Sequence, residues 1–110
     1  MIVSPESAEA LYAFLLTTKP FSRWKLPDPH DVHFEIMAKA DTFADYTAPK
    51  HRIRISAALC TWTDTYLKTM IHEVCHLKQE IEGRPLEHDS YFIELVNQAC
   101  KVHKMDPSTI

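Results

Sequence analysis

The sequence lacks any long apolar run. No stretch of its 110 residues approaches the roughly 20 consecutive apolar residues that a membrane-spanning helix needs. The amino terminus also lacks the charged segment, apolar core and small-residue cleavage site of a secretory leader. We therefore expect no membrane partner and a cytoplasmic location.

Cysteine is scarce, and neither sign of charge is in large excess. Three cysteines are present, an odd number, widely spaced and in apolar surroundings, so we expect reduced core residues rather than a disulfide framework or a zinc ribbon. These are Cys60, Cys75 and Cys100. With 12 Lys and Arg against 15 Asp and Glu, the net charge of -3 argues against binding nucleic acid over the whole surface, although a local basic patch is left open.

Internal repeats, low-complexity segments and interdomain linkers are absent as well. A chain of this length is long enough for one compact core and too short for two domains of ordinary size. We expect a single domain over residues 1–110. Its oligomeric state is left open.

The first predicted helix runs from about Pro5 to Thr18. Ser4 can cap it, Pro5 suits the first helical position, and apolar residues then recur at helical spacing. Pro20 should end the helix, and the proline-containing segment from Phe21 to Asp31 is expected to be a loop.

Three later segments alternate apolar and polar residues, which is typical of half-buried strands. They are Val32 to Ala40, a weaker one near Phe43 to Tyr46, and Arg52 to Ser56. In the last, Ile53 and Ile55 face one way and the two arginines the other. We expect a small antiparallel, or mixed, three-stranded sheet.

The most informative segment is a predicted helix that starts at Thr63 or Asp64 and ends near Glu82, before Gly83 and Pro85. Its apolar residues gather into one stripe at 100° per residue. That stripe consists of Leu67, Met70, Ile71, Val74, Leu77 and Ile81. His72 and His76 lie about 160° from the middle of this stripe, with Glu73 at its edge, so the helix has one face for a core and another for chemistry.

Two histidines four residues apart on a helix share one face, so both rings can reach one ion at about 2.0 to 2.1 Å. Glu73 points about 100° around the helix, where it can act on a metal-bound water. This is the geometry of the His-Glu-x-x-His motif. The sequence therefore predicts His72 and His76 as zinc ligands and Glu73 as the general base.

A catalytic zinc ion usually has three protein ligands. His88 follows His76 by 12 residues and stands at or just before a last predicted helix, which Asp89 or Ser90 can cap and which runs to about Lys104. The loop between them can return to the metal, so we expect His88 as the third ligand. Four acidic residues stay open as alternatives: Glu82, Glu87, Asp89 and Glu94.

The motif His72-Glu73-Val74-Cys75-His76, followed by His88-Asp89-Ser90-Tyr91-Phe92, resembles the SprT-like zinc metallopeptidases, which include the Spartan proteases. The match covers about Arg52 to Lys101, and the strand Arg52 to Ser56 looks like the edge strand of that family. Asp89 stands where the family often has glycine, and the similarity is to the minimal catalytic domain without the zinc ribbon.

The resemblance implies an α+β, zincin-like minimal metallopeptidase domain with three helices and a small sheet. It also implies Zn²⁺ held by His72, His76 and His88, with Glu73 as catalytic base. We therefore expect a metallopeptidase that hydrolyses peptide bonds of a protein or peptide substrate. Two other functions stay open: a zinc hydrolase of a non-protein amide, and a non-catalytic zinc-binding or inhibitor protein.

Substrate contacts are predicted at two places. The strand from Arg52 to Ser56, with Ile53 and Ile55, is expected to be an edge that pairs with the substrate backbone. A hydrogen-bond donor to the developing oxyanion is also needed, and Tyr91, Tyr66 and His103 are the candidates.

Overall fold

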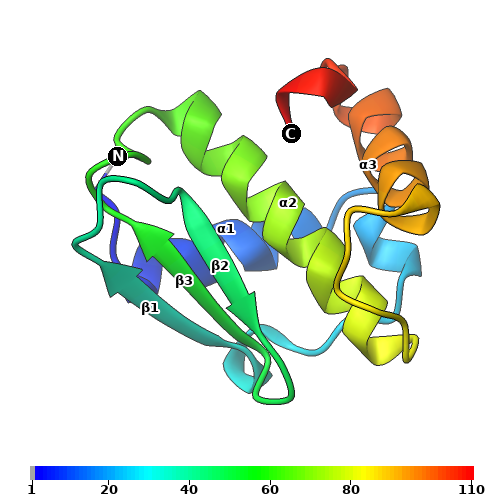
Figure 1. Cartoon of the computed structure of the whole chain (residues 1–110), viewed down its shortest axis with the longest axis horizontal. Coiled ribbons are helices and arrows are strands. Elements are labelled where there is room, and N and C mark those ends of the chain that lie inside the picture. The colour runs from blue at the N-terminus through cyan, green and yellow to red at the C-terminus, as the bar shows by residue number, and fades with distance from the viewer. Residues whose placement is uncertain (1) are drawn as a thin grey trace.

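Three α-helices and a three-stranded sheet make up the fold, so the predicted α+β class is confirmed (Figure 1). The computed structural model describes residues 2–110. The helices are α1 (Pro5–Leu16), α2 (Thr63–Ile81) and α3 (Ser90–His103). The strands are β1 (His33–Met37), β2 (Ala44–Thr47) and β3 (Arg52–Ser56). Short 3-10 turns lie at Phe21–Arg23, Pro29–Asp31 and Pro107–Thr109.

Strand β3 is the central strand of the sheet, whose order is β1-β3-β2. It runs parallel to β1, with Ile36 beside Ile55, and antiparallel to β2, with Tyr46 opposite Ile53. The sheet is therefore mixed, which is one of the two predicted arrangements, and the parallel pair is β1 with β3. Alternation of apolar and polar residues predicts where strands lie but not the order in which they pair. Here β2 and β3 form a hairpin, and β1 pairs with the remaining side of β3.

Ile53 and Ile55 point from this central strand into the core and are fully buried. The prediction that Arg52 to Ser56 is a substrate-binding edge is therefore wrong, because both sides of β3 already pair with neighbours. A substitution such as Ile55→Pro is therefore no test of substrate binding, because it would disrupt the central strand of the sheet. Among the described residues, the free edge that faces α2 belongs to β2 (Figure 1).

Helix α1 begins as predicted, with Pro5 in its first turn. Ser4 caps it through a reciprocal capping box, in which the Ser4 hydroxyl accepts from the Ser7 N–H at 3.0 Å. The helix ends at Leu16, two residues before the predicted end. The hydroxyls of Thr17 and Thr18 donate to carbonyls of the last turn, which satisfies those groups where the helix stops.

Helix α2 lies across the middle of the molecule, between the sheet and α3 (Figure 1). Its predicted apolar stripe is confirmed, since Met70, Ile71, Val74 and Leu77 are fully buried. Gly83, with a φ of +69°, lies just past its end, as expected for a helix stop. Trp62 occupies the N-cap position without a side-chain hydrogen bond, so neither Thr63 nor Asp64 is the cap.

Helix α3 packs against α2 and is capped as predicted by Asp89, whose carboxylate accepts from the Phe92 N–H at 3.0 Å. Its apolar residues join those of α1, α2 and β3 in one core. The C-terminal turn folds back toward α2 (Figure 1). None of the described helices has the length and apolar character needed to cross a bilayer.

Candidate metal centre

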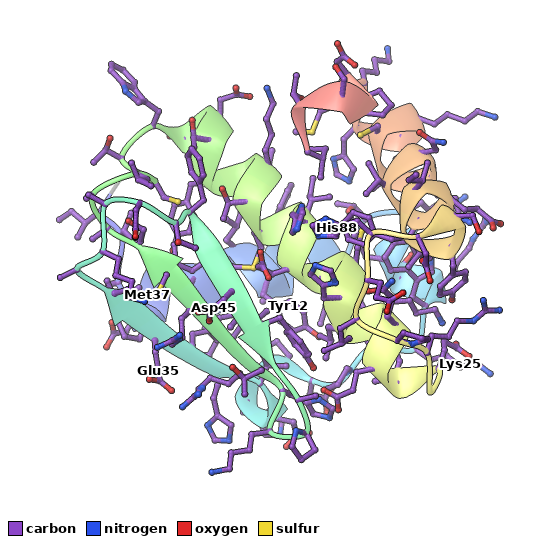
Figure 2. All side chains as sticks on the ribbon, in the orientation of Figure 1. Tyr12, Lys25, Glu35, Met37, Asp45 and His88 are labelled. Atoms are coloured by element: carbon purple, nitrogen blue, oxygen red, sulfur yellow. The ribbon has the colours of Figure 1, made fainter. Side chains whose placement is uncertain are left out.

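Three histidines meet at one side of α2. His72 and His76 lie one turn apart on the helix, and His88 reaches them from the loop that leads into α3. One ring nitrogen from each lies within 4.8 Å of those of the other two. His76 Nε2 and His88 Nε2 are 3.1 Å apart. Figure 2 shows His88 beside the middle of α2, and Asp45 on the neighbouring strand β2.

The donor set and its spacing fit a zinc ion. Ligands at about 2.05 Å from a tetrahedral centre lie about 3.3 Å from one another, close to the separation of His76 and His88. Three imidazoles also match the usual protein ligand count of a catalytic zinc site. The Phe92 ring lies 4.9 Å from that of His72, 4.8 Å from that of His76 and 4.6 Å from that of His88, and so gives the cluster an apolar wall.

The acidic residues considered as third ligands lie outside this cluster. Glu82 forms an ion pair with Lys78, and Asp89 is engaged in capping α3. Glu87 and Glu94 are exposed and do not join the histidine cluster. The structure therefore brings together the three histidines that the sequence selected.

The environment keeps the helical histidines neutral. Burial is the largest cause that lowers the pKa of His72 to about 4, followed by the neighbouring His76 and His88. Burial likewise lowers the pKa of His76. A neutral imidazole has a free nitrogen lone pair, which is the form that binds a metal ion.

Glu73 is 4% exposed and lies beside the histidines. Burial, with a smaller contribution from Asp45, raises the pKa of its carboxyl to about 8. The side chain lines two adjacent cavities, of about 590 and about 240 Å³. A molecule bound in either cavity would therefore have the Glu73 carboxyl in its wall.

The two cavities share Ala44, His72 and Glu73, so they form neighbouring parts of one cleft between β2 and α2. The larger part extends toward the start of α2 and is lined there by Lys68, with Ile110 from the C-terminal turn. The smaller part lies beside the histidine cluster. Its further lining residues are Asp45, Tyr46, His76, Leu86 and His88.

We compared the chain with protein-family models, with curated proteins and with solved structures. None of the three comparisons found a match. We therefore infer the chemistry of this chain from its own residues.

The three candidates for an oxyanion donor do not line the cleft. Tyr66 is fully buried and hydrogen-bonds to Ser7, and His103 contacts Thr18 at 3.0 Å. Tyr91 lies under the guanidinium of Arg84, 4.0 Å from it, and serves as its stacking partner. All three side chains have partners outside the residues that line the cleft.

The phenol that does line the cleft is Tyr46 on β2, which sequence reasoning missed. Its hydroxyl donates to Glu80 of α2, and His51 Nδ1 lies 3.0 Å from the other carboxylate oxygen of Glu80. This network attaches β2 and the β2–β3 turn to the helix. One signal was available: Glu80 continues the four-residue spacing of His72 and His76 along the same helix face.

The three cysteines are buried free thiols, as predicted. Burial is the main cause that raises the pKa of Cys75, and Cys100 and Glu73 add to the shift. A thiol with a raised pKa is a poor metal ligand and a poor nucleophile. The chemistry of the cleft therefore belongs to its histidines and Glu73.

Proposed function

We propose that this chain is a zinc-dependent peptidase with a zincin-like site, related to the SprT-like metallopeptidases that its motif resembles. The observation that carries the proposal is the convergence of three imidazoles with the buried Glu73 in the wall of one cleft. His72, His76 and His88 would hold the ion. When bound, zinc supplies a Lewis acid for the peptide carbonyl and lowers the pKa of its water to about 7.

Glu73 is the general base in this proposal. Its carboxylate takes a proton from the water that adds to the peptide carbonyl carbon, and it returns that proton to the nitrogen as the C–N bond breaks. In the metal-free protein, burial raises the pKa of this carboxyl to about 8. The positive charge of a zinc ion held beside it would favour the ionised form, which is the form that a general base needs. The Phe92 ring packs against the rings of all three histidines.

The substrate backbone would bind along the free edge of β2, which borders both parts of the cleft. The Ser56 N–H donates to the Phe43 carbonyl at 2.8 Å. Because such bonds alternate along an antiparallel pair, Asp45 directs its backbone groups to β3, whereas Ala44 and Tyr46 direct theirs to the free edge. An extended peptide can pair with those groups with little regard to its sequence.

Replacing Ala44 by proline should weaken peptide hydrolysis by removing the outward N–H of β2. The loss of one backbone hydrogen bond predicts a fall in kcat/KM of about tenfold or more. Zinc affinity should not change, because Ala44 contributes no ligand. Ala44→Val is the matched control, since it adds similar bulk and keeps the N–H. Equal kcat/KM for Ala44→Pro and Ala44→Val would exclude pairing at this position.

Metal analysis combined with an assay on unstructured peptides tests the proposed function. We expect one zinc ion per chain, hydrolysis that disappears on chelation, and recovery when zinc is returned. A chain that holds zinc but cleaves no peptide, while hydrolysing small amides, would favour a non-protein amide as substrate. A zinc-loaded chain that is inactive on both would be a non-catalytic binding protein.

A further inference from the structure

Gln79 is a buried polar residue that connects His76 to the loop that carries His88. It lies on α2 three residues after His76, and its side chain is fully buried. Its Oε1 lies 2.7 Å from His76 Nδ1, and its Nε2 lies 2.7 Å from the carbonyl oxygen of Glu87, next to His88. The same nitrogen lies 3.4 Å from the Asp89 carboxylate, which caps α3.

These contacts fix the proton on His76. A backbone carbonyl only accepts hydrogen bonds, so the amide nitrogen of Gln79 must be the end that faces Glu87. Its carbonyl oxygen then faces His76 and also only accepts, so His76 Nδ1 must carry the hydrogen. In a neutral ring this leaves Nε2 with the free lone pair. That is the nitrogen 3.1 Å from His88 Nε2.

The same side chain holds the loop that carries His88. Residues 82–88 are exposed, so this loop has little packing of its own. Besides the Gln79 side-chain bond to Glu87, the Gln79 carbonyl accepts from the Arg84 N–H at 2.8 Å. Gln79 therefore attaches the loop at both its beginning and its end.

We propose that Gln79 is the positioning residue of the metal centre: its amide selects the Nδ1–H form of His76 and holds the His88 loop against it. The inference rests on the proposed zinc site. Partners that orient histidine ligands typically contribute roughly 10- to 100-fold to metal affinity. Gln79 touches two ligand-bearing segments at once, so its loss should affect both.

Gln79→Met tests the proposal, because methionine has a similar length but makes neither hydrogen bond. In the metal-free protein, imidazole ¹⁵N chemical shifts should report a change of His76 from the Nδ1–H form toward Nε2–H. Zinc affinity, measured by competition with a chelating dye, should fall roughly 10- to 100-fold. Gln98→Met is the control, since Gln98 lies exposed on α3 and outside the cleft.

Gln79→Glu separates positioning from simple loss of structure. A carboxyl oxygen can still accept from His76 Nδ1, so the Nδ1–H form should persist and zinc affinity should fall less than in Gln79→Met. If Gln79→Met does not fold, a change to the Nε2–H form in Gln79→Glu overturns the inference. Wild-type zinc affinity and tautomer in a folded Gln79→Met also overturn it, and leave the metal centre standing. A wild-type chain that binds no zinc removes the metal centre and this inference together.

Discussion

Glu73→Gln should abolish peptide hydrolysis and at the same time make the metal-free protein more stable. General-base catalysis typically contributes about 100- to 10,000-fold to rate, and a glutamine cannot take the proton from water. We therefore expect a fall of that size in kcat with unchanged zinc content. The measurements are steady-state hydrolysis and metal analysis of the same preparation.

The gain in stability follows from burial of the Glu73 carboxyl. In the unfolded chain this group ionises above its ordinary pKa of 4.5, whereas the fold keeps it protonated up to about pH 8. The free energy of unfolding of the wild type should therefore decrease as the pH rises from 4.5 to about 8. In Glu73→Gln this decrease should be absent, because glutamine does not ionise. At neutral pH we expect Glu73→Gln to be more stable by about 3 kcal/mol in urea unfolding. At about pH 4.5 the difference should be small.

Glu9→Gln is the matched control. It is the same chemical change as Glu73→Gln, but Glu9 is exposed on α1. It should alter neither hydrolysis nor the pH dependence of unfolding. All other ionisable groups are the same in the proteins compared, so their contributions cancel from the difference. A Glu73→Gln protein that still hydrolyses peptides at the wild-type rate would remove Glu73 from the mechanism.

His88→Ala should lower zinc affinity by about 1,000-fold. The free energy of zinc binding to small domains is about 10 to 16 kcal/mol in total. One of three or four ligands therefore accounts for about 4 kcal/mol of it, which corresponds to about 1,000-fold in affinity. His88 lies in an exposed loop, so its loss should leave the metal-free fold intact. Chelator competition gives the affinity, and the rise in melting temperature on adding zinc should disappear in the variant.

His33→Ala is the control for that experiment, since His33 is an exposed histidine on β1. It should bind zinc like the wild type. If His88→Ala keeps its zinc affinity within about threefold, His88 is not a ligand and the acidic residues of the same loop become the candidates. His72→Ala and His76→Ala should still lose affinity in that case, because both belong to the helical motif.

Local sequence patterns predicted the elements well and their arrangement poorly. The bounds of β3 are as predicted, and α2 ends within one residue of the expected position, because spacing along a strand or a helix depends only on backbone geometry. Strand β1 is shorter than expected and β2 lies one residue later. The order of the strands was not predictable, since alternation does not say which strands pair.

The same distinction between local pattern and arrangement applies to the candidate metal centre. Glu73 was placed at the edge of the apolar stripe, and it is indeed buried. Tyr46 was not recognised, because its strand is short and its approach to α2 depends on the β2–β3 hairpin. Gln79 was not recognised either, because nothing in its spacing showed that both ends of its amide would find partners.

The sequence by itself determined the helix that presents His72, Glu73 and His76, since a helical period places residues four apart on one face whatever surrounds them. Tertiary structure decided between His88 and the acidic alternatives for the third position of the cluster. It alone showed that β2 rather than β3 offers a free edge, and that Gln79 joins His76 to the loop. Each of these depends on contacts between separate segments, and packing of the whole chain sets those contacts. A periodic pattern within one segment carries no information about them.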